Sequence, residues 1–204
     1  MKNKGLVFVI SGPSGSGKGT VVDELRKICT DVGVSVSATT RKPREGEVDG
    51  VNYHYMTREQ FEKLLAEGEI LEHTEYNGNY YGTLKREARK IIDSGKDLIL
   101  EIEVDGGSQV RNLMGDDCVL IMLLAPTAAE QERRLRDRNT DTEEAIAGRL
   151  AKAKIEVAMA PQYDYIVLNE TGKTLECAND ILHIINASHY TVSRMRTVTD
   201  HYFD

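Results

Sequence analysis

The chain has 204 residues, of which 40% are hydrophobic and 29% are charged, and its formal net charge is −7. This length supports one domain with a substantial core, and the composition is ordinary for a soluble globular protein. The negative charge argues against a general nucleic-acid binder, because such binding depends on neutralising phosphates.

The cysteines and the N-terminal segment bear on the compartment. Cys29, Cys118 and Cys177 form no CxxC pair, and an odd number suits reduced thiols in a cytosol. The N-terminal apolar run, LVFVI, is too short for a signal sequence or a membrane span. We therefore expect a cytoplasmic protein that binds neither a membrane nor nucleic acid.

A glycine-rich loop is the first functional signal. The run LVFVI predicts a buried strand, and an amphipathic helix follows the loop. Backbone N–H groups of such a loop converge on a phosphate, the helix N-terminus favours negative charge, and Lys18 reaches the β and γ phosphates. Gly19 stands where the common pattern has a Mg²⁺-binding hydroxyl, and Thr20 can supply that oxygen. The predicted ATP-binding residues here are Gly12, Pro13, Ser14, Gly15, Ser16, Gly17, Lys18, Gly19 and Thr20.

The next segment predicts a small, strand-rich lobe at about 35–82. VSVSATT (34–40) and VNYHYM (51–56) read as strands around a polar loop, RKPREGEVDG. Thr57 and Gln60 form a capping box for a helix, and NGN (77–79) between two strand-like runs indicates a hairpin.

The larger fold then resumes. DLILEIEV (97–104) and CVLIMLLA (118–125) are near-continuous apolar runs, typical of parallel strands covered on both faces. Thr127 and Glu130 form the capping box of an arginine-rich helix, the polar DRNTDTEE follows it, and Ile146 opens the stripe of another helix. YIVL (165–168) is a last strand, a closing helix follows, and the tail from about 191 lacks apolar periodicity. The alternation predicts an α/β three-layer domain.

Two further groups of polar residues suggest binding sites. Arg41, Arg44 and Tyr53 suit one phosphate monoester, because arginine forks match its oxygens. Glu101 and Glu103 are two apart, so we expect them on the same face of a strand, near its carboxyl end, where open α/β sheets bind ligands.

These motifs together resemble the guanylate kinase family of nucleoside monophosphate kinases. The likeness rests on SGPSGSGKGT, SVSATTRKPREGE, GNYYGT and RLRDRNTDTEEAIAGRL, and it extends from about Leu6 to Leu182. It implies a three-layer P-loop NTPase fold with a central parallel sheet in a single domain, 1–204. Within it the resemblance implies a core at 1–33 and 96–190, a GMP-binding lobe at about 35–82, a helical lid at about 134–150 and a polar tail at 191–204.

The resemblance also implies residue roles. GMP is expected on Ser37, Arg41, Arg44, Tyr53, Glu72, Tyr81, Thr83 and Glu103, the last standing where the family usually has Asp. The residues expected to neutralise phosphate charge during catalysis are Lys18, Arg41, Arg134, Arg138 and Arg149. Asn169 is expected near the adenine, and Asn139 stands where the lid commonly has Gly. Mg²⁺ is expected to enter with ATP, held through water by Thr20 and Glu101 rather than in a site built by the protein alone.

The implied reaction is transfer of the γ-phosphoryl group from ATP to GMP, and also to dGMP, in purine nucleotide metabolism. Guanine offers N1–H and N2–H₂ donors to Glu72, whereas adenine presents a bare lone pair, and such a mismatch discriminates by roughly 10⁴–10⁵. Three alternatives remain at this stage: an adenylate kinase, a scaffold domain of the same fold that binds phosphopeptides, and a nucleotide sensor without turnover. The presence of Lys18, Arg134, Arg138 and Arg149 argues against the scaffold.

Overall fold

The computed structural model describes residues 5–76, 78–137 and 141–204. Its main sheet has five strands in the order β2-β7-β1-β8-β9, and every neighbouring pair is parallel. The strands are β1 (Val7–Ser11), β2 (Val32–Val34), β7 (Asp97–Glu101), β8 (Cys118–Leu124) and β9 (Tyr165–Leu168). The central strand β1 is buried along its whole length, as its continuous apolar run predicted.

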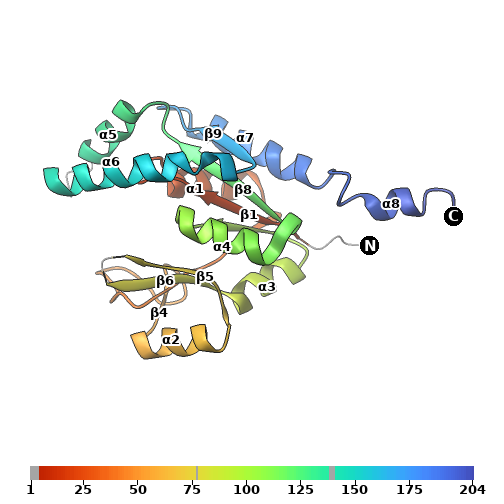
Figure 1. Cartoon of the computed structure of the whole chain (residues 1–204), viewed down its shortest axis with the longest axis horizontal. Coiled ribbons are helices and arrows are strands. Elements are labelled where there is room, and N and C mark those ends of the chain that lie inside the picture. The colour runs from red at the N-terminus through yellow and green to blue at the C-terminus, as the bar shows by residue number, and fades with distance from the viewer. Residues whose placement is uncertain (1–4, 77, 138–140) are drawn as a thin grey trace.

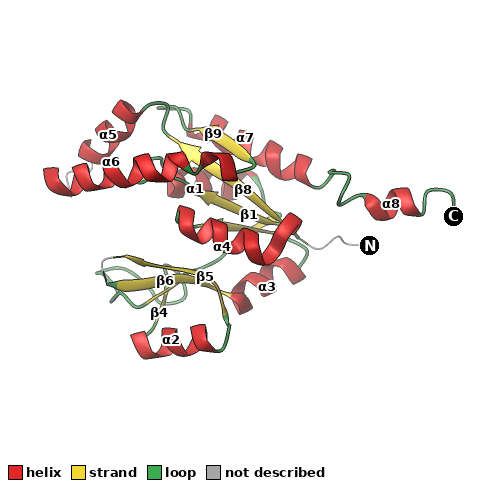
Figure 2. Ribbon diagram, viewed as in Figure 1, coloured by secondary structure: helices red, strands yellow, loops and turns green. Residues whose placement is uncertain are grey.

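Helices cover both faces of this sheet (Figure 2). On one face, α1 (Lys18–Ile28) and α7 (Thr174–Ser188) pack residues such as Leu25 and Ile181 against the strands. On the other face, α3 (Lys85–Asp93) and α4 (Val104–Met114) contribute Ile92 and Val110. The predicted three-layer α/β fold is thereby confirmed, although the sequence reading had not anticipated α3 and α4.

A second, four-stranded sheet follows β2 in the chain, and it lies below the main sheet in Figure 1. Its order is β4-β3-β6-β5, made by β3 (Ala38–Thr39), β4 (His54–Tyr55), β5 (Ile70–Tyr76) and β6 (Asn79–Leu84). Helix α2 (Arg58–Ala66) packs its buried Phe61 against this sheet. The capping box of Thr57 and Gln60 and the β5–β6 hairpin are both confirmed.

One predicted strand is divided between the two sheets. VSVSATT was expected to be continuous, but β2 ends at Val34 beside β7, and β3 begins at Ala38 beside β4 and β6. The prediction was wrong because alternation looks the same whichever sheet a strand joins.

Helices α5 (Ala128–Asp137) and α6 (Glu143–Ala158) come between β8 and β9 in the chain and lie next to each other (Figure 1). Thr142 caps α6 by accepting from the N–H of Ala145 at 3.3 Å. At the start of α5, Thr127 accepts from the N–H of Glu130 at 3.1 Å, while the carboxylate of Glu130 is bound to arginines instead of closing a capping box. Arg138 and Asn139 lie outside the described residues.

Short helical segments complete the chain. Single 3₁₀ turns span Gly115–Asp117 and Ala160–Gln162. The tail contains a short helix, α8 (Arg196–Asp200), and extends away from the body of the molecule in Figure 1.

Candidate active site

A cleft of about 830 Å³ collects side chains from the phosphate loop, the carboxyl end of β7, the second sheet and α6. It is lined by thirteen of the residues that the sequence singled out: Ser14, Gly15, Gly17, Lys18, Gly19, Thr20, Ser37, Tyr53, Glu72, Tyr81, Glu101, Glu103 and Arg149. The other described residues that the sequence singled out are not among those lining the cleft: Gly12, Pro13, Ser16, Arg41, Arg44, Thr83, Arg134 and Asn169.

The phosphate loop joins β1 directly to α1. Gly17 caps α1 with φ 91°, and a Cβ there would lie 2.4 Å from Nδ2 of Asn169, so only glycine fits the close approach. Lys18 is the first helical residue, and its Nζ donates to the carbonyl of Gly12 at 2.6 Å. The loop therefore combines a helix N-terminus with an ammonium group, the arrangement that binds phosphate.

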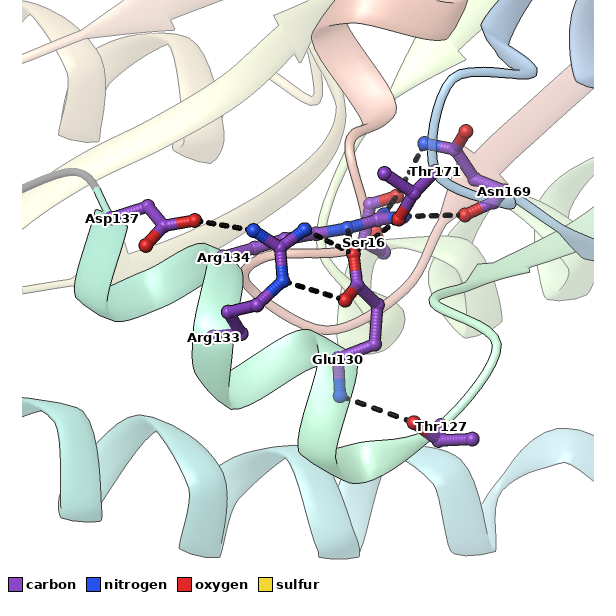
Figure 3. A network of polar contacts seen from close by, with 8 residues as sticks. All are labelled: Ser16, Thr127, Glu130, Arg133, Arg134, Asp137, Asn169 and Thr171. Carbon is purple, nitrogen blue, oxygen red and sulfur yellow. Dashed lines mark hydrogen bonds and ion pairs between the residues drawn. The ribbon is translucent and has the colours of Figure 1, made fainter.

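Arg134 and Asn169 brace this loop from outside (Figure 3). Arg134 donates from Nη2 to the carbonyl of Asn169 at 2.8 Å and from Nη1 to the carbonyl of Ser16 at 3.4 Å. The Asn169 side chain donates to the same Ser16 carbonyl at 2.9 Å. Glu130 accepts from Nε of Arg134 at 2.8 Å and so fixes the guanidinium against the loop.

Arg149 reaches the phosphate loop from α6. Its Nη1 donates to Oγ of Ser14 at 2.8 Å, and its Nη2 lies 3.1 Å from a carboxylate oxygen of Asp141. Arg149 lines the cleft together with three other cationic side chains, those of Lys18, Arg26 and Lys152.

Glu72 is the buried carboxylate of the cleft, with 3% of its surface exposed. Its Oε1 accepts from the hydroxyl of Thr83 at 2.7 Å across the β5–β6 ladder. Its Oε2 lies close to the first turn of α4, because a Cβ on Gly106 would come within 2.5 Å of it. Burial raises the pKa of Glu72 to about 7, against the opposing effect of the Thr83 bonds.

The predicted phosphate-binding arginines are organised by a residue that the sequence reading did not single out. Glu47 accepts from Nη2 of Arg41 at 2.9 Å, from the backbone N–H of Arg44 at 2.7 Å and from the hydroxyl of Tyr55 at 2.8 Å. Hydrogen bonds, first that from Arg41, lower the pKa of Glu47 to about 2. Arg41 also lies over the ring of Tyr53, 5.4 Å from its centroid.

Glu101 and Glu103 both line the cleft, but they do not share one strand face. Glu101 is the last residue of β7, whereas Glu103 is the N-cap residue of α4, so the expectation from two-residue spacing was wrong. The chain leaves the sheet between them, and strand alternation no longer applies. Glu103 instead accepts from Nζ of Lys152 at 2.8 Å.

Lys152, Glu156 and Tyr76 line the cleft as well, and sequence reasoning missed all three. A usable signal existed for two of them: Lys152 and Glu156 follow Arg149 by three and seven residues and therefore share its helix face.

Metal-binding potential is limited to the edge of the phosphate loop. Within the described residues, no three His, Cys, Asp or Glu side chains gather closely enough to hold a metal ion. A Cβ on Gly19 would lie 3.5 Å from Oε1 of Glu101, so this carboxylate faces the start of α1, and Thr20 also lines the cleft there. These two oxygen-bearing side chains fit a hard cation that keeps most of its waters. Among the helices that the structure describes, none is long and apolar enough to cross a membrane.

Comparison with known proteins gives a consistent picture. A family model described as guanylate kinase matches residues 4–185. The guanylate kinase of Halalkalibacterium halodurans is 50% identical, with 95% of this chain and 94% of the relative covered. That of Lactococcus lactis is 45% identical, with coverages of 96% and 94%. A crystal structure of guanylate kinase from Anaplasma phagocytophilum superposes with a TM-score of 0.75 at 31% identity, covering 94% of this chain and 89% of that one.

Proposed function

The chain belongs to the guanylate kinase family and is therefore an ATP:GMP phosphotransferase, and we propose that the cleft described above performs the reaction. The observation that carries the proposal is the shared cleft itself. Lys18 of the phosphate loop and the buried Glu72 carboxylate line one cavity of about 830 Å³, which supports a phosphate site and a base site within the same cleft.

The donor side receives ATP on the loop from Gly12 to Thr20. The N-terminus of α1 and Lys18 take the β and γ phosphates, and Arg149 neutralises the transferring group from α6. Arg134, which donates a hydrogen bond to the loop carbonyl of Ser16, also neutralises the negative charge of the transferring phosphoryl group. The adenine lies near Asn169 in this proposal, and the side chain of Asn169 bonds the same Ser16 carbonyl.

The acceptor side receives GMP in the second sheet. Arg41, Arg44, Tyr53 and Tyr81 hold the phosphate, supported by the Glu47 bond to Arg41. The ring is bound by Ser37, Thr83, Glu72 and Glu103. Ionised Glu72 accepts from the guanine N1–H and N2–H₂ groups, and this buried acceptor rejects adenine, because the mismatch would leave it unpaired. The deoxy acceptor dGMP fits the same scheme.

Mg²⁺ accompanies ATP in this proposal. Thr20 and Glu101, which both lie close to the start of α1, would hold the ion through water. The ion supplies additional neutralisation of phosphate charge.

The chain's own residues act by alignment and charge. The attacking oxygen belongs to the GMP phosphate and is already anionic, so no strong base is needed. Lys18, Arg41, Arg134, Arg138 and Arg149 offset the repulsion between two anionic nucleotides, and the surrounding lobe and helices exclude water from the γ-phosphoryl group. Both substrates belong to the cell's nucleotide pool, which favours a cytoplasmic role in GMP recycling.

The test is a steady-state assay with ATP and each of GMP, dGMP, AMP, UMP and CMP. GMP should give the highest kcat/KM, and Lys18→Ala should lower kcat by about 10³-fold or more while thermal unfolding stays cooperative. A higher kcat/KM for AMP, or near-normal kcat in the Lys18 variant with ATP saturating, would contradict the proposed site.

A further inference from the structure

We propose that Lys152 is a positioning residue of the acceptor site, which holds the Glu103 carboxylate in the part of the cleft that receives the purine base. The inference rests on the proposed function and adds a residue to it. Lys152 belongs to α6, whereas Glu103 is the N-cap residue of α4, so the contact joins two helices that are far apart in the sequence.

The contacts of Lys152 all lie at this point of the cleft. Its Nζ donates to Oε2 of Glu103 at 2.8 Å and lies 3.3 Å from Oε1 of Glu156. It also lies 5.8 Å from the ring centroid of Tyr76, the last residue of β5. One ammonium group thus meets α4, α6 and the second sheet.

Lys152 offsets the repulsion between neighbouring carboxylates in the cleft. Five carboxylates line the cleft, namely those of Asp23, Glu72, Glu101, Glu103 and Glu156. Burial opposes ionisation of Glu103, but the bond from Lys152 and the charge of Lys18 hold its pKa below the ordinary value. Without Lys152, an ionised Glu103 would repel the neighbouring Glu156 carboxylate, which contacts the same ammonium group, and would turn away from the base site.

Glu103 and Glu72 both lie at the beginning of α4. Glu72 Oε2 lies against Gly106 in the first turn, and Glu103 caps the same turn. Thr83 fixes one carboxylate and Lys152 the other, so each fixed group offers an acceptor in a defined place to the donors of one base.

The position of Lys152 on α6 connects the two halves of the site. Arg149 lies one turn earlier on the same helix and contacts Ser14 of the phosphate loop. A displacement of α6 would therefore move the contact of Arg149 with Ser14 and the contact of Lys152 with Glu103 together. Lys152 can in this way affect GMP binding through Glu103 without contacting GMP itself.

The experiment compares steady-state kinetics of the full-length wild type, Lys152→Ala, Lys152→Gln, Lys152→Arg, Glu103→Gln and the double variant Lys152→Ala/Glu103→Gln. Lys152→Ala and Lys152→Gln should raise the KM for GMP by about three- to fivefold, the upper part of the range for a partly exposed charged contact, with kcat and the KM for ATP within about twofold. Lys152→Arg should restore the KM for GMP. The double variant should be no worse than Glu103→Gln alone, because the lysine acts through that carboxylate.

The matched control is Lys154→Ala, which removes an equal charge from an exposed position of α6 that forms no ion pair within the described part of the chain. It should leave all constants unchanged. An unaltered KM for GMP in both neutral Lys152 variants, additive effects with Glu103→Gln, or an equal change in kcat and in the KM for ATP would overturn the role. Wild-type protein that forms no ADP with GMP would instead contradict the proposed function, so the two failures are distinguishable.

Discussion

Glu72 illustrates how burial and hydrogen bonding set the chemistry of a single residue. Its carboxylate is almost completely buried, and only one of its oxygens is bonded to Thr83. The raised pKa means that Glu72 holds its proton up to about pH 7, whereas an exposed Glu has an ordinary pKa of 4.5. As the pH rises from about 4.5 to about 7, the free energy of unfolding of the unliganded protein falls, because the unfolded chain releases the Glu72 proton before the folded chain does.

This pKa predicts a pH dependence of GMP binding. The form that accepts from guanine N1–H and N2–H₂ is gained as the pH rises through about 7, so the KM for GMP should rise as the pH falls from 8 to 6, approaching tenfold per unit. Steady-state kinetics at constant ionic strength measure it. Glu72→Gln should have a higher KM for GMP and a reduced preference over AMP, and its KM should keep only the pH dependence of the GMP phosphate, which ionises near ~6. An identical pH profile in this variant would exclude Glu72 as the titrating acceptor.

Glu47 is the corresponding single carboxylate at the proposed site for the GMP phosphate. It accepts hydrogen bonds from Arg41, from Tyr55 and from the backbone of Arg44, and both of its oxygens are used. The ionised carboxylate suits these contacts because both of its oxygens are acceptors, whereas an amide would place a donor at one of them. We predict that Glu47→Gln raises the KM for GMP by about tenfold, since a charge-assisted contact becomes a neutral one, and leaves the KM for ATP unchanged. Glu45→Gln, on an exposed neighbouring position, is the control. Equal KM values for GMP in the two variants would remove Glu47 from the phosphate site.

Residue roles could be predicted from the sequence where a motif fixes the backbone around them, and not where a tertiary contact decides. Lys18 follows from the strand, loop and helix that are contiguous around it. The partner of Glu103 does not, because Lys152 is 49 residues away and meets it only after α6 packs. Arg41 and Arg44 were expected as a pair, but Glu47 binds one through its guanidinium and the other through its backbone.

At the scale of elements, α5 is joined to the phosphate loop by the network in Figure 3. Glu130, in the first turn, accepts from Arg133 and Arg134 and also from the hydroxyl of Thr171. These bonds, first that from Arg133, hold the pKa of Glu130 well below its usual range, so it stays charged throughout the physiological range. The helix thereby orients Arg134 toward the carbonyls of Ser16 and Asn169.

Glu130→Gln should therefore loosen Arg134 without removing it. We expect kcat to fall by about tenfold and the KM for ATP to rise, with little effect on the KM for GMP, because only the donor side of the cleft is altered. The matched control is Glu132→Gln on the same helix, which pairs with Arg136 at 2.8 Å and touches no part of the loop. If both variants lower kcat equally, the effect belongs to the helix as a whole and not to the positioning of Arg134.

Helix α4 shows why some elements escape prediction. Its sequence, VDGGSQVRNLM, contains adjacent glycines, which disfavour a helix by about 1 kcal/mol each relative to Ala. Close packing explains them: a Cβ on Gly106 would meet Glu72, and one on Gly107 would lie 3.3 Å from the hydroxyl of Tyr163. Local propensity argued against a helix that tertiary contacts require. The strand pattern of β1 and β8, by contrast, agreed with its surroundings and was predicted correctly.

For the whole molecule, the class of fold followed from alternating apolar segments, but strand order did not. β7 and β8 lie on either side of β1, and this pairing brings Glu101 beside the phosphate loop. Glu101 and the loop are about 80 residues apart in the sequence. Sequence periodicity carries no information on which strands pair. The cleft, which depends on this pairing and on the second sheet, could be predicted only as a set of residues and not as a shape.

The tail is the part of the molecule least connected to that cleft. His189 Nε2 lies 2.8 Å from Asp97 Oδ2, and Arg194 donates to the carbonyls of Ser188 and Asp116, so the chain is fastened to the core up to this point. Beyond it, Tyr202 and Phe203 are 71% and 96% exposed. No described residue of the tail lines the cleft.

Removing residues 195–204 should therefore leave kcat and both KM values within about twofold, and should change Tm by no more than about 2 °C, because less than 1 kcal/mol of contacts is lost in a chain of this size. Removing residues 188–204 also deletes the buried Ser188, the His189 contact with Asp97 and both Arg194 bonds, and should lower Tm by about 4 °C or more. Calorimetry and the GMP assay on both truncated proteins measure the difference. Should the shorter deletion destabilise the fold as much as the longer one, or lower turnover tenfold, the exposed aromatic end would have a structural role that its lack of packing argues against.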